Sequence, residues 1–172
     1  MIEDDLSKIR VTQNTFYSNI KKNALMKETQ KIECAELVLK EFAIEELISK
    51  TIYIGENSNK IFISYPFYKT YAAISNYQLI VDQIIQFIFH VLTKFTTFEI
   101  HINLESFTTT ALQRNLCVFN LYYESCCIQN LCYDQNKLDR IVVYNTPKVI
   151  NFLSTLIVKF TDKTIKKKIV LL

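Results

Sequence analysis

The sequence predicts an α/β fold in which helices cover a mostly parallel sheet. The main observation is the last third of the chain, where a β-branched run at 141–143 precedes apolar residues at helical spacing over 149–160 and a second apolar run at 168–172. Strand, helix and strand in that order form the parallel crossover unit. Upstream, helical and alternating patterns also succeed one another, which is typical of layered α/β domains.

Length and composition narrow the possibilities. With 172 residues, 49% hydrophobic and 22% charged, the chain has the balance of one globular domain with a sizeable core. A net charge of only +3 excludes a protein that generally coats nucleic acid, and we expect no nucleic-acid partner. The single Gly leaves no glycine-rich phosphate cradle. Heavy use of Ile, Asn and Lys suggests an AT-rich genome, such as that of a large DNA virus or an intracellular parasite.

The cysteines predict buried thiols rather than a metal site or a disulfide framework. They are Cys34, Cys117, Cys126, Cys127 and Cys132, and no pair has zinc-site spacing with a second pair or with His. Thiols of this kind belong to a reducing compartment. The opening Met-Ile-Glu-Asp-Asp has the wrong charge for a secretory signal. We therefore expect a cytoplasmic protein, with or without peripheral membrane contact.

The first part of the chain predicts helices followed by a hairpin. Residues 1–22 are polar and weakly patterned, which indicates a loose arm or a short helix. Residues 24–50 predict one helix, because apolar residues follow one face while Glu and Lys fill the other. Residues 51–54 and 60–65 predict two paired strands, and the composition of 55–59 predicts the turn between them.

The middle of the chain predicts two long helices around a strand. Ser75 and Gln78 have capping-box spacing for a helix over 76–95. That helix is apolar nearly all round but its apolar run is too short to span a bilayer, so it either packs in the core or lines an apolar cavity. Residues 98–104 alternate as a strand, and 108–132 predict one helix. Its apolar side carries Leu112, Leu116, Phe119, Tyr123, Cys127 and Leu131.

The end of the chain predicts a strand that passes directly into a helix. Thr146 is the expected N-cap, and Pro147 takes the first helical position, where its missing N–H costs nothing. A closing strand is expected over 168–172.

Two segments carry a family resemblance: Ile141-Val-Val-Tyr-Asn-Thr-Pro147 and Phe160-Thr-Asp-Lys-Thr-Ile-Lys-Lys-Lys-Ile169. From about Lys60 onward, roughly two-thirds of the chain, the sequence resembles the CRAL-TRIO (Sec14-like) lipid-binding domain. In that family a strand ends in Asn-x-Pro, and a Lys-Ile pair opens the next strand. At the position of the family's Tyr-Pro-x-x-Leu segment, this sequence has residues 133–138. At the position of the family's strand followed by Asp-x-x-Gly, it has residues 98–107.

The sequence also departs from the family pattern. Asn103 and Ser106 replace the Asp and the Gly, and the segment from Tyr133 to Leu138 lacks its Pro and is one residue longer. The family continues beyond this last strand into a gate over the lipid, whereas this sequence stops at Leu172. The resemblance therefore leaves three arrangements open: an open pocket, a pocket closed by a protein partner at this C-terminal edge, or a fold kept for another purpose.

The resemblance implies a ligand, namely a hydrophobic small molecule or a phospholipid, held in an apolar cavity between sheet and helices. Such a pocket gains affinity from apolar area, at about 25 cal/mol per Å² removed from water. The candidate lining residues are Phe87, Ile88, Val91, Leu92, Ile100, Ile102, Leu116, Phe119 and Tyr123. For any single one of them, plain packing against its neighbours is the simpler interpretation.

A basic cluster near the C-terminus suggests contact with an anionic membrane. It consists of Lys159, Lys163, Lys166, Lys167 and Lys168. Near an anionic membrane each such charge contributes about 1 kcal/mol. The simpler interpretation is a solvated helix end, where cations also offset the helix dipole, and it is the favoured one.

The histidines do not build a recognisable catalytic motif. His101 shares one face of its strand with Glu99, so an acid–base pair or a head-group contact is one interpretation, and an ordinary satisfied histidine is the simpler one. His90 is the only other histidine. Because no nucleophile–base motif, metal constellation or paired acid site accompanies them, we expect no enzyme, no catalytic residues and no metal or cofactor.

Two functions from different classes follow. We expect an N-terminal arm and helix over 1–50 and one compact domain of the resembled type over 51–172. The first hypothesis is non-catalytic binding or exchange of a hydrophobic ligand. The alternative is a structural or interaction module, for example a virion-associated or membrane-adjacent protein. A cavity bounded by 77–95 and 98–123 favours the first hypothesis, and a filled interior with an exposed apolar strip favours the second.

Overall fold

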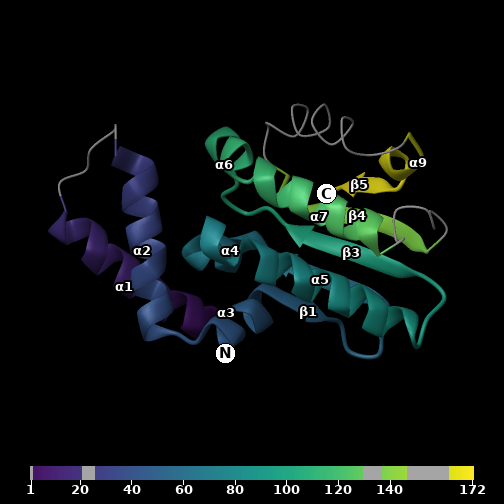
Figure 1. Cartoon of the computed structure of the whole chain (residues 1–172). Helices are drawn as coiled ribbons and strands as arrows, with labels where there is room; N and C mark the ends of the chain where they lie inside the picture. The colour runs from purple at the N-terminus through teal and green to yellow at the C-terminus, as the bar shows by residue number, and fades with distance from the viewer. Residues whose placement is uncertain (1, 21–25, 130–136, 147–162) are drawn as a thin grey trace.

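The computed structural model describes residues 2–20, 26–129, 137–146 and 163–172. Its helices are α1 (Ile2–Asn19), α2 (Lys27–Glu41), α3 (Ile44–Thr51), α4 (Tyr65–Tyr71), the 3-10 turn η2 (Ile74–Asn76), α5 (Tyr77–Leu92), α6 (Thr109–Arg114), α7 (Leu116–Ile128) and α9 (Lys163–Lys166). Its strands are β1 (Ile52–Ile54), β2 (Lys60–Ser64), β3 (Phe98–Asn103), β4 (Leu138–Tyr144) and β5 (Ile169–Leu171). Figure 1 shows their arrangement.

The five strands form one mixed sheet in chain order, β1-β2-β3-β4-β5. β1 and β2 are antiparallel, and the pairs from β2 to β5 are parallel. The predicted α/β class is therefore confirmed, as is the parallel pairing of the last two strands, in which Ile141 lies opposite Ile169. The helix expected between those two strands falls on 147–162, outside the described residues.

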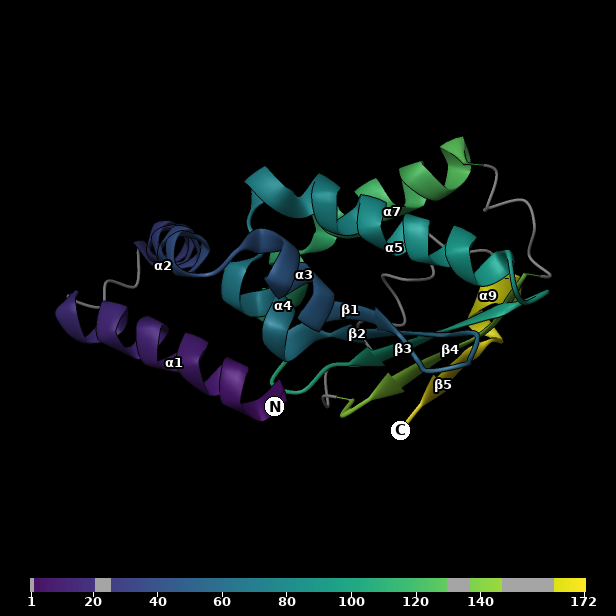
Figure 2. The same ribbon diagram turned by 90° about the horizontal axis from the view of Figure 1, so that it is seen from below.

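The helices form one layer over the sheet and a second group at its end. In Figure 2, α5 and α7 lie over the same face of the sheet. α1 and α2 stand at the end where α4 follows the carboxyl end of β2, with α3 and α4 between them and the strands. No helix of the described residues lies across the opposite face of β2–β4 (Figure 2). Among the described residues, the two faces of the sheet therefore have different surroundings.

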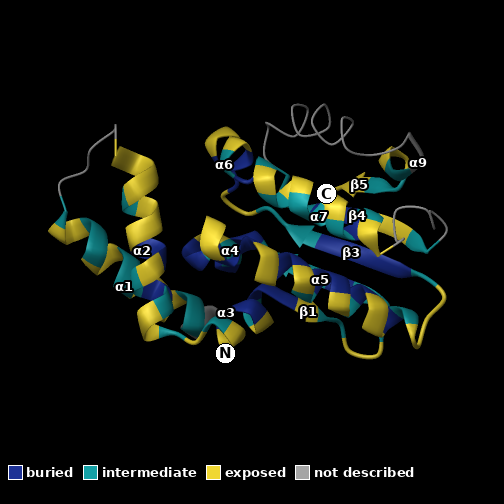
Figure 3. Cartoon of the chain, viewed as in Figure 1, coloured by how far each residue is buried: buried dark blue, intermediate teal, exposed yellow. Residues whose placement is uncertain are grey.

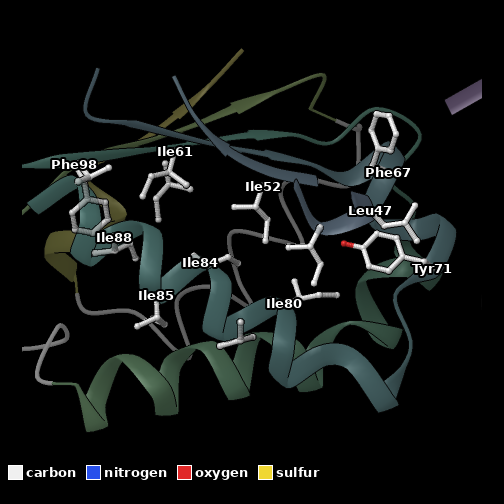
Figure 4. Packing of buried hydrophobic residues seen from close by; sticks show 14 of the residues in the cluster. Leu47, Ile52, Ile61, Phe67, Tyr71, Ile80, Ile84, Ile85, Ile88 and Phe98 are labelled. Carbon is white, nitrogen blue, oxygen red and sulfur yellow. The ribbon is translucent and has the colours of Figure 1, made fainter. Parts of the chain in front are cut away.

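One hydrophobic cluster joins these parts. It includes Ile9 of α1, Val38 of α2, Ile61 of β2 and Ile88 of α5, all almost fully inaccessible to solvent. Figure 4 shows Ile88 among the packed side chains of this cluster, and Figure 3 shows the buried residues gathered along β3 and the sheet-facing side of α5. Removing this apolar surface from water is the main stabilising term in the fold, at about 25 cal/mol per Å².

The predicted hairpin is confirmed. Ile52 pairs with Ile63 and Ile54 with Ile61, and the Gly55 N–H donates to the Lys60 carbonyl over 2.9 Å. Gly55 is closely packed, since a Cβ there would lie 2.5 Å from Ser58 Oγ.

Two predicted helices are wrong in extent, and a third segment is more regular than expected. The helix expected over 24–50 is divided, because Phe42 and Ala43 adopt extended backbone between α2 and α3. The helix expected over 108–132 is divided at Asn115, whose side-chain amide donates to the Ala111 carbonyl over 2.7 Å. Residues 2–19, expected as an arm or a short helix, form the 18-residue α1.

The capping box expected at Ser75 is also wrong. The α5 N-cap is Asn76, and no side chain caps that helix. Asn76 turns back instead: its Oδ1 accepts from the Ala73 N–H over 3.0 Å, and its Nδ2 donates to the Tyr71 carbonyl over 2.9 Å. The buried Asn76 side chain thus forms hydrogen bonds with backbone groups of the preceding loop, and the expected serine cap is absent.

Candidate functional site

Six of the nine residues expected to line an apolar pocket lie together between α5 and the sheet. They are Phe87, Ile88, Val91, Leu92, Ile100 and Ile102. Ile88, Val91 and Ile100 are buried, and the other three pack against the same cluster while partly exposed. These side chains contact one another as a core does, and their role as ligand contacts stays a prediction.

The other three candidates lie on α7 and do not share that environment. Phe119 is 38% exposed and Tyr123 45% exposed, while Leu116 is half-buried. The core-facing side of α7 instead carries Val118, Leu121 and Tyr122. Phe119 and Tyr123 were expected on the inward side of one continuous helix. The helix is divided at Asn115, and both side chains are exposed.

None of the nine candidate residues lines either of the two best-formed cavities in the described part of the chain. The larger has a volume of about 620 Å³, and its walls come from α1 and α2 on one side and from α4 and α6 on the other. We call it the N-terminal cleft; Figure 1 shows these four helices. Its volume lies in the range of about 300–1,000 Å³ that is usual for small-molecule sites.

The walls of the N-terminal cleft combine aromatic and apolar side chains. Tyr17 of α1, Ile32 of α2, Tyr65 of α4, Ile74 and Tyr77 all line it. Tyrosine presents an apolar ring with a polar tip, so it suits a ligand that is partly apolar and partly polar.

Three cations and one carboxylate also line the N-terminal cleft. Arg114 Nε lies 2.9 Å from Glu28 Oε1, so this arginine has the carboxylate as its partner. Lys69 Nζ donates to the neutral Ser106 hydroxyl over 2.5 Å. Lys31 has no hydrogen bond or ion pair with any described residue. Two lysines in the cleft therefore lack an anionic partner.

The pKa values of the two cleft lysines, Lys31 and Lys69, are lowered. Burial lowers the pKa of Lys31, and the positive charge of Arg114 lowers it further. Burial likewise lowers the pKa of Lys69, with Arg10 adding to the effect. In both cases the charged form is disfavoured by lost hydration and by a neighbouring cation, which an anion in the cleft would offset.

The tyrosines of the cleft remain neutral hydrogen-bonding groups over the physiological range. Burial raises the pKa of Tyr17 to about 12, with the adjacent Cys34 thiol adding to the shift. Burial also raises the pKa of Tyr65 and of Tyr77. Each can therefore donate a phenolic hydrogen to a bound acceptor.

A second polar cluster lies on the sheet face opposite α5 and α7. His101 Nε2 lies 2.8 Å from Glu99 Oε2, and His101 Nδ1 lies 2.7 Å from the Tyr144 hydroxyl. Glu99 is 8% exposed and His101 is 5% exposed. The His101 ring lies between the rings of Phe62 and Tyr144, with ring centroids 4.9 and 5.8 Å away.

The smaller cavity, of about 180 Å³, borders this cluster. His101 and Tyr144 line it together with Tyr53, Ser64 and Asn103. Ser64, Asn103 and Tyr144 end β2, β3 and β4, so the cavity lies at the carboxyl ends of parallel strands. Ligand sites of open α/β sheets prefer that edge.

The shared face of Glu99 and His101 is confirmed, but Tyr144 was missed as their partner. The alternation along β3 was enough to place the first two side chains on one face. The contact with Tyr144 depends on the β3–β4 register, in which His101 lies opposite Val142 and Asn103 opposite Tyr144. A parallel register between strands some 40 residues apart leaves no signal in a single sequence.

The basic cluster is only partly described. The side chains of Lys166 and Lys167 are exposed. Lys168 is half-buried, and its ammonium donates to the Leu138 carbonyl, which fastens β5 to β4. Lys159 lies outside the described residues, as does the Lys163 side chain. Membrane contact by this cluster stays a prediction, and it rests on Lys166 and Lys167.

The described ranges hold neither a metal-binding cluster nor a membrane-spanning helix. Across these residues, no three His, Cys, Asp or Glu side chains gather where they could hold a metal ion. Among the described helices, none has the length and apolarity that crossing a bilayer requires.

Comparison with known proteins adds no relative: no family model matches the chain, and no curated protein matches it.

Proposed function

We propose that this protein binds an amphipathic, lipid-like ligand with an anionic head group and does not catalyse a reaction on it. The N-terminal cleft would receive the ligand, and Lys31 and Lys69 would face its head group. This retains the class of ligand expected from the sequence but places the site away from the nine expected residues.

The observation that carries the proposal is the charge imbalance of the cleft. Lys31, Lys69 and Arg114 line it with one carboxylate, that of Glu28, which Arg114 already engages. Like charges in a partly buried cleft repel one another, and an entering anion is attracted by all of them. Burial is the main cause of the lowered lysine pKa values, and the neighbouring arginines add to it.

The dimensions and walls of the cleft support an amphipathic ligand rather than a bare ion. A free phosphate would fill a small part of about 620 Å³. The remaining wall carries Ile32, Ile74 and the rings of three tyrosines, which gain from removing apolar ligand surface from water.

Calorimetric titration of the full chain tests the proposal with three probes: dihexanoyl phosphatidic acid, the matching diacylglycerol and inorganic phosphate. We expect the phosphatidic acid to bind more tightly than either of the others, because it alone supplies both parts of the ligand. Equal affinity for phosphate alone would assign the cleft to free anions, and absence of all binding would contradict the proposal.

A charge-matched pair of variants locates the site. Replacing Lys31 and Lys69 with Gln should weaken phosphatidic acid binding by about tenfold or more, since each charged hydrogen bond contributes roughly 1.5–3 kcal/mol. Replacing Lys40 and Lys94, which are exposed and lie outside the cleft, removes the same charge and should leave the affinity unchanged. Equal loss in both variants would mean that net charge, and not the cleft, attracts the ligand.

A specific observation favours a second candidate function, that of an interaction module. The space between α5 and the sheet is packed, while Leu79 and Phe89 of α5 and Phe119 and Tyr123 of α7 are exposed on the helix layer. Exposed apolar side chains on one layer are typical of partner surfaces.

Sedimentation velocity of the wild-type chain and of a Phe89→Ser, Phe119→Ser variant tests whether this surface binds a second copy of the chain. A monomer in both cases would exclude self-association through it.

A further inference from the structure

On the sheet face opposite α5 and α7, the cluster of Glu99, His101 and Tyr144 has a defined direction of hydrogen bonding. Arg140 Nε also lies 3.4 Å from Glu99 Oε1. An ionised carboxylate can only accept, so the 2.8 Å contact with Glu99 places the hydrogen on His101 Nε2. In the neutral imidazole His101 Nδ1 is then the acceptor, and the Tyr144 hydroxyl donates to it over 2.7 Å. Carboxylate, imidazole and hydroxyl in this order make a base-activated nucleophile when the hydroxyl faces an accessible site.

Tyr144 does face such a site, because it lines the cavity of about 180 Å³ together with His101. That cavity and the N-terminal cleft share no lining residue, so the two sites are independent. Its volume admits only a small compound.

A hydrogen-bond donor for the compound is also present in the cavity wall. Asn103 Oδ1 accepts from the Glu105 N–H and from Asn145 Nδ2, each over 2.9 Å. These two bonds fix the orientation of the Asn103 amide. Its Nδ2 has no partner among the described residues, and Asn103 lines the cavity. A free amide donor beside an activated hydroxyl is the arrangement that stabilises a developing oxyanion.

We propose that Tyr144 is a nucleophile that takes an acyl group from a small activated acyl compound, with His101 as its base and Glu99 as the residue that positions His101. The Tyr144 oxygen would bond to the acyl carbon while the bond from that carbon to the leaving group breaks. The phenolic proton passes to His101 Nδ1 and then to the leaving group. No oxidant or reductant takes part.

The test is acetylation of the full chain by N-acetylimidazole, with the rate at each tyrosine followed by peptide mass spectrometry. Tyr53 is the internal control, because it lines the same cavity, is 41% exposed and has no hydrogen-bond partner among the described residues. We expect half-buried Tyr144 to react at least ~10-fold faster than Tyr53, a conservative threshold for a positioned base, which contributes about 100-fold or more. A Tyr144 rate at or below the Tyr53 rate would overturn the proposal.

Three variants separate activation from folding. Glu99→Gln keeps the volume but removes the carboxylate, and His101→Phe keeps a ring but removes the base. Both should lower the ratio of Tyr144 to Tyr53 rates by about tenfold or more, whereas His90→Phe, at the exposed second histidine, should leave it unchanged. If His101→Phe does not fold, the ratio of Tyr144 to Tyr53 rates in the wild type and in Glu99→Gln still tests the proposal. If the ratio of Tyr144 to Tyr53 rates were unchanged in Glu99→Gln, the role of Glu99 in positioning His101 would be refuted.

Discussion

The Tyr68 hydroxyl donates a 2.8 Å hydrogen bond to Asn115 Oδ1, and this contact ties α4 to the break between α6 and α7. Asn115 is buried, and its Nδ2 donates to the Ala111 carbonyl within α6. One side chain therefore ends a helix and also joins it to another element. Sequence alone did not predict this contact.

Replacing Tyr68 with Phe should lower the free energy of unfolding by about 1–3 kcal/mol, because it leaves the buried Asn115 oxygen without its partner. Urea unfolding measures the change. Tyr53→Phe is the matched control, because it removes a hydroxyl from an exposed ring and should change stability by less than about 0.5 kcal/mol. Equal stability of the two variants would show that the contact contributes nothing.

Replacing Gly55 with Ala should also destabilise the fold. The new Cβ would lie 2.5 Å from Ser58 Oγ and 3.0 Å from the Phe62 ring. The Ser58 hydroxyl must therefore rotate away from the Lys60 N–H, to which it is hydrogen-bonded, and the Phe62 ring must move aside. We expect a loss of about 1–3 kcal/mol, as for other overpacking substitutions, measured as a lower urea midpoint. Glu56→Ala, in the same turn and exposed, is the control. An unchanged midpoint for Gly55→Ala would mean that the turn adapts without cost.

Alkaline pH should weaken the fold through its buried tyrosines. Burial raises the pKa of Tyr68 and of Tyr71 above the ordinary value. The native state then keeps protons that the unfolded chain releases at about pH 10, so this stabilisation is complete below that pH and is lost as pH rises above it. Urea unfolding between pH 8.5 and 11 should show a falling free energy of unfolding, and a flat profile would contradict the assignment.

A variant assigns part of that pH dependence to one residue. Tyr71 donates to Thr51 Oγ1 over 2.9 Å in the core. Tyr71→Phe should lower stability at neutral pH and make the alkaline decline shallower, because one titrating group is gone. A decline as steep as that of the wild type would exclude Tyr71 as a contributor.

Replacing Lys166 and Lys167 with Gln should weaken sedimentation with anionic vesicles at low salt, by about 1 kcal/mol per charge. Lys168 is kept, because its ammonium holds the Leu138 carbonyl and its loss would disturb the sheet. The Lys40→Gln, Lys94→Gln variant again matches the charge change. Identical sedimentation of the two variants would mean that Lys166 and Lys167 do not contact the membrane and are ordinary solvated residues at a helix end.

Local patterns were sufficient for most strands of the fold. The alternation at 98–104 and the β-branched run at 141–143 placed β3 and the centre of β4, and the turn composition at 55–59 placed the hairpin. These signals are strong because a buried strand face requires apolar residues at a period of two. The parallel pairing of β4 with β5 followed from the crossover pattern and is confirmed.

Features that depend on contacts between distant residues were not predictable. The breaks at Phe42 and Asn115 carry no Gly or Pro, and the Asn115 break is held by Tyr68 from another helix. The N-terminal cleft brings Lys31, Lys69 and Arg114 together from three helices that no sequence pattern relates. Tyr144 joins Glu99 and His101 only through the register of β3 with β4.

The most direct test of the central proposal is an NMR titration of the isotope-labelled chain with dihexanoyl phosphatidic acid. Binding in the N-terminal cleft predicts that amide shifts change around Tyr17, Lys31, Lys69 and Tyr77, which line it, and not around Ile88 or Ile100 in the packed interior. Shift changes centred on Ile88 and Ile100 instead, or none at all, would contradict it.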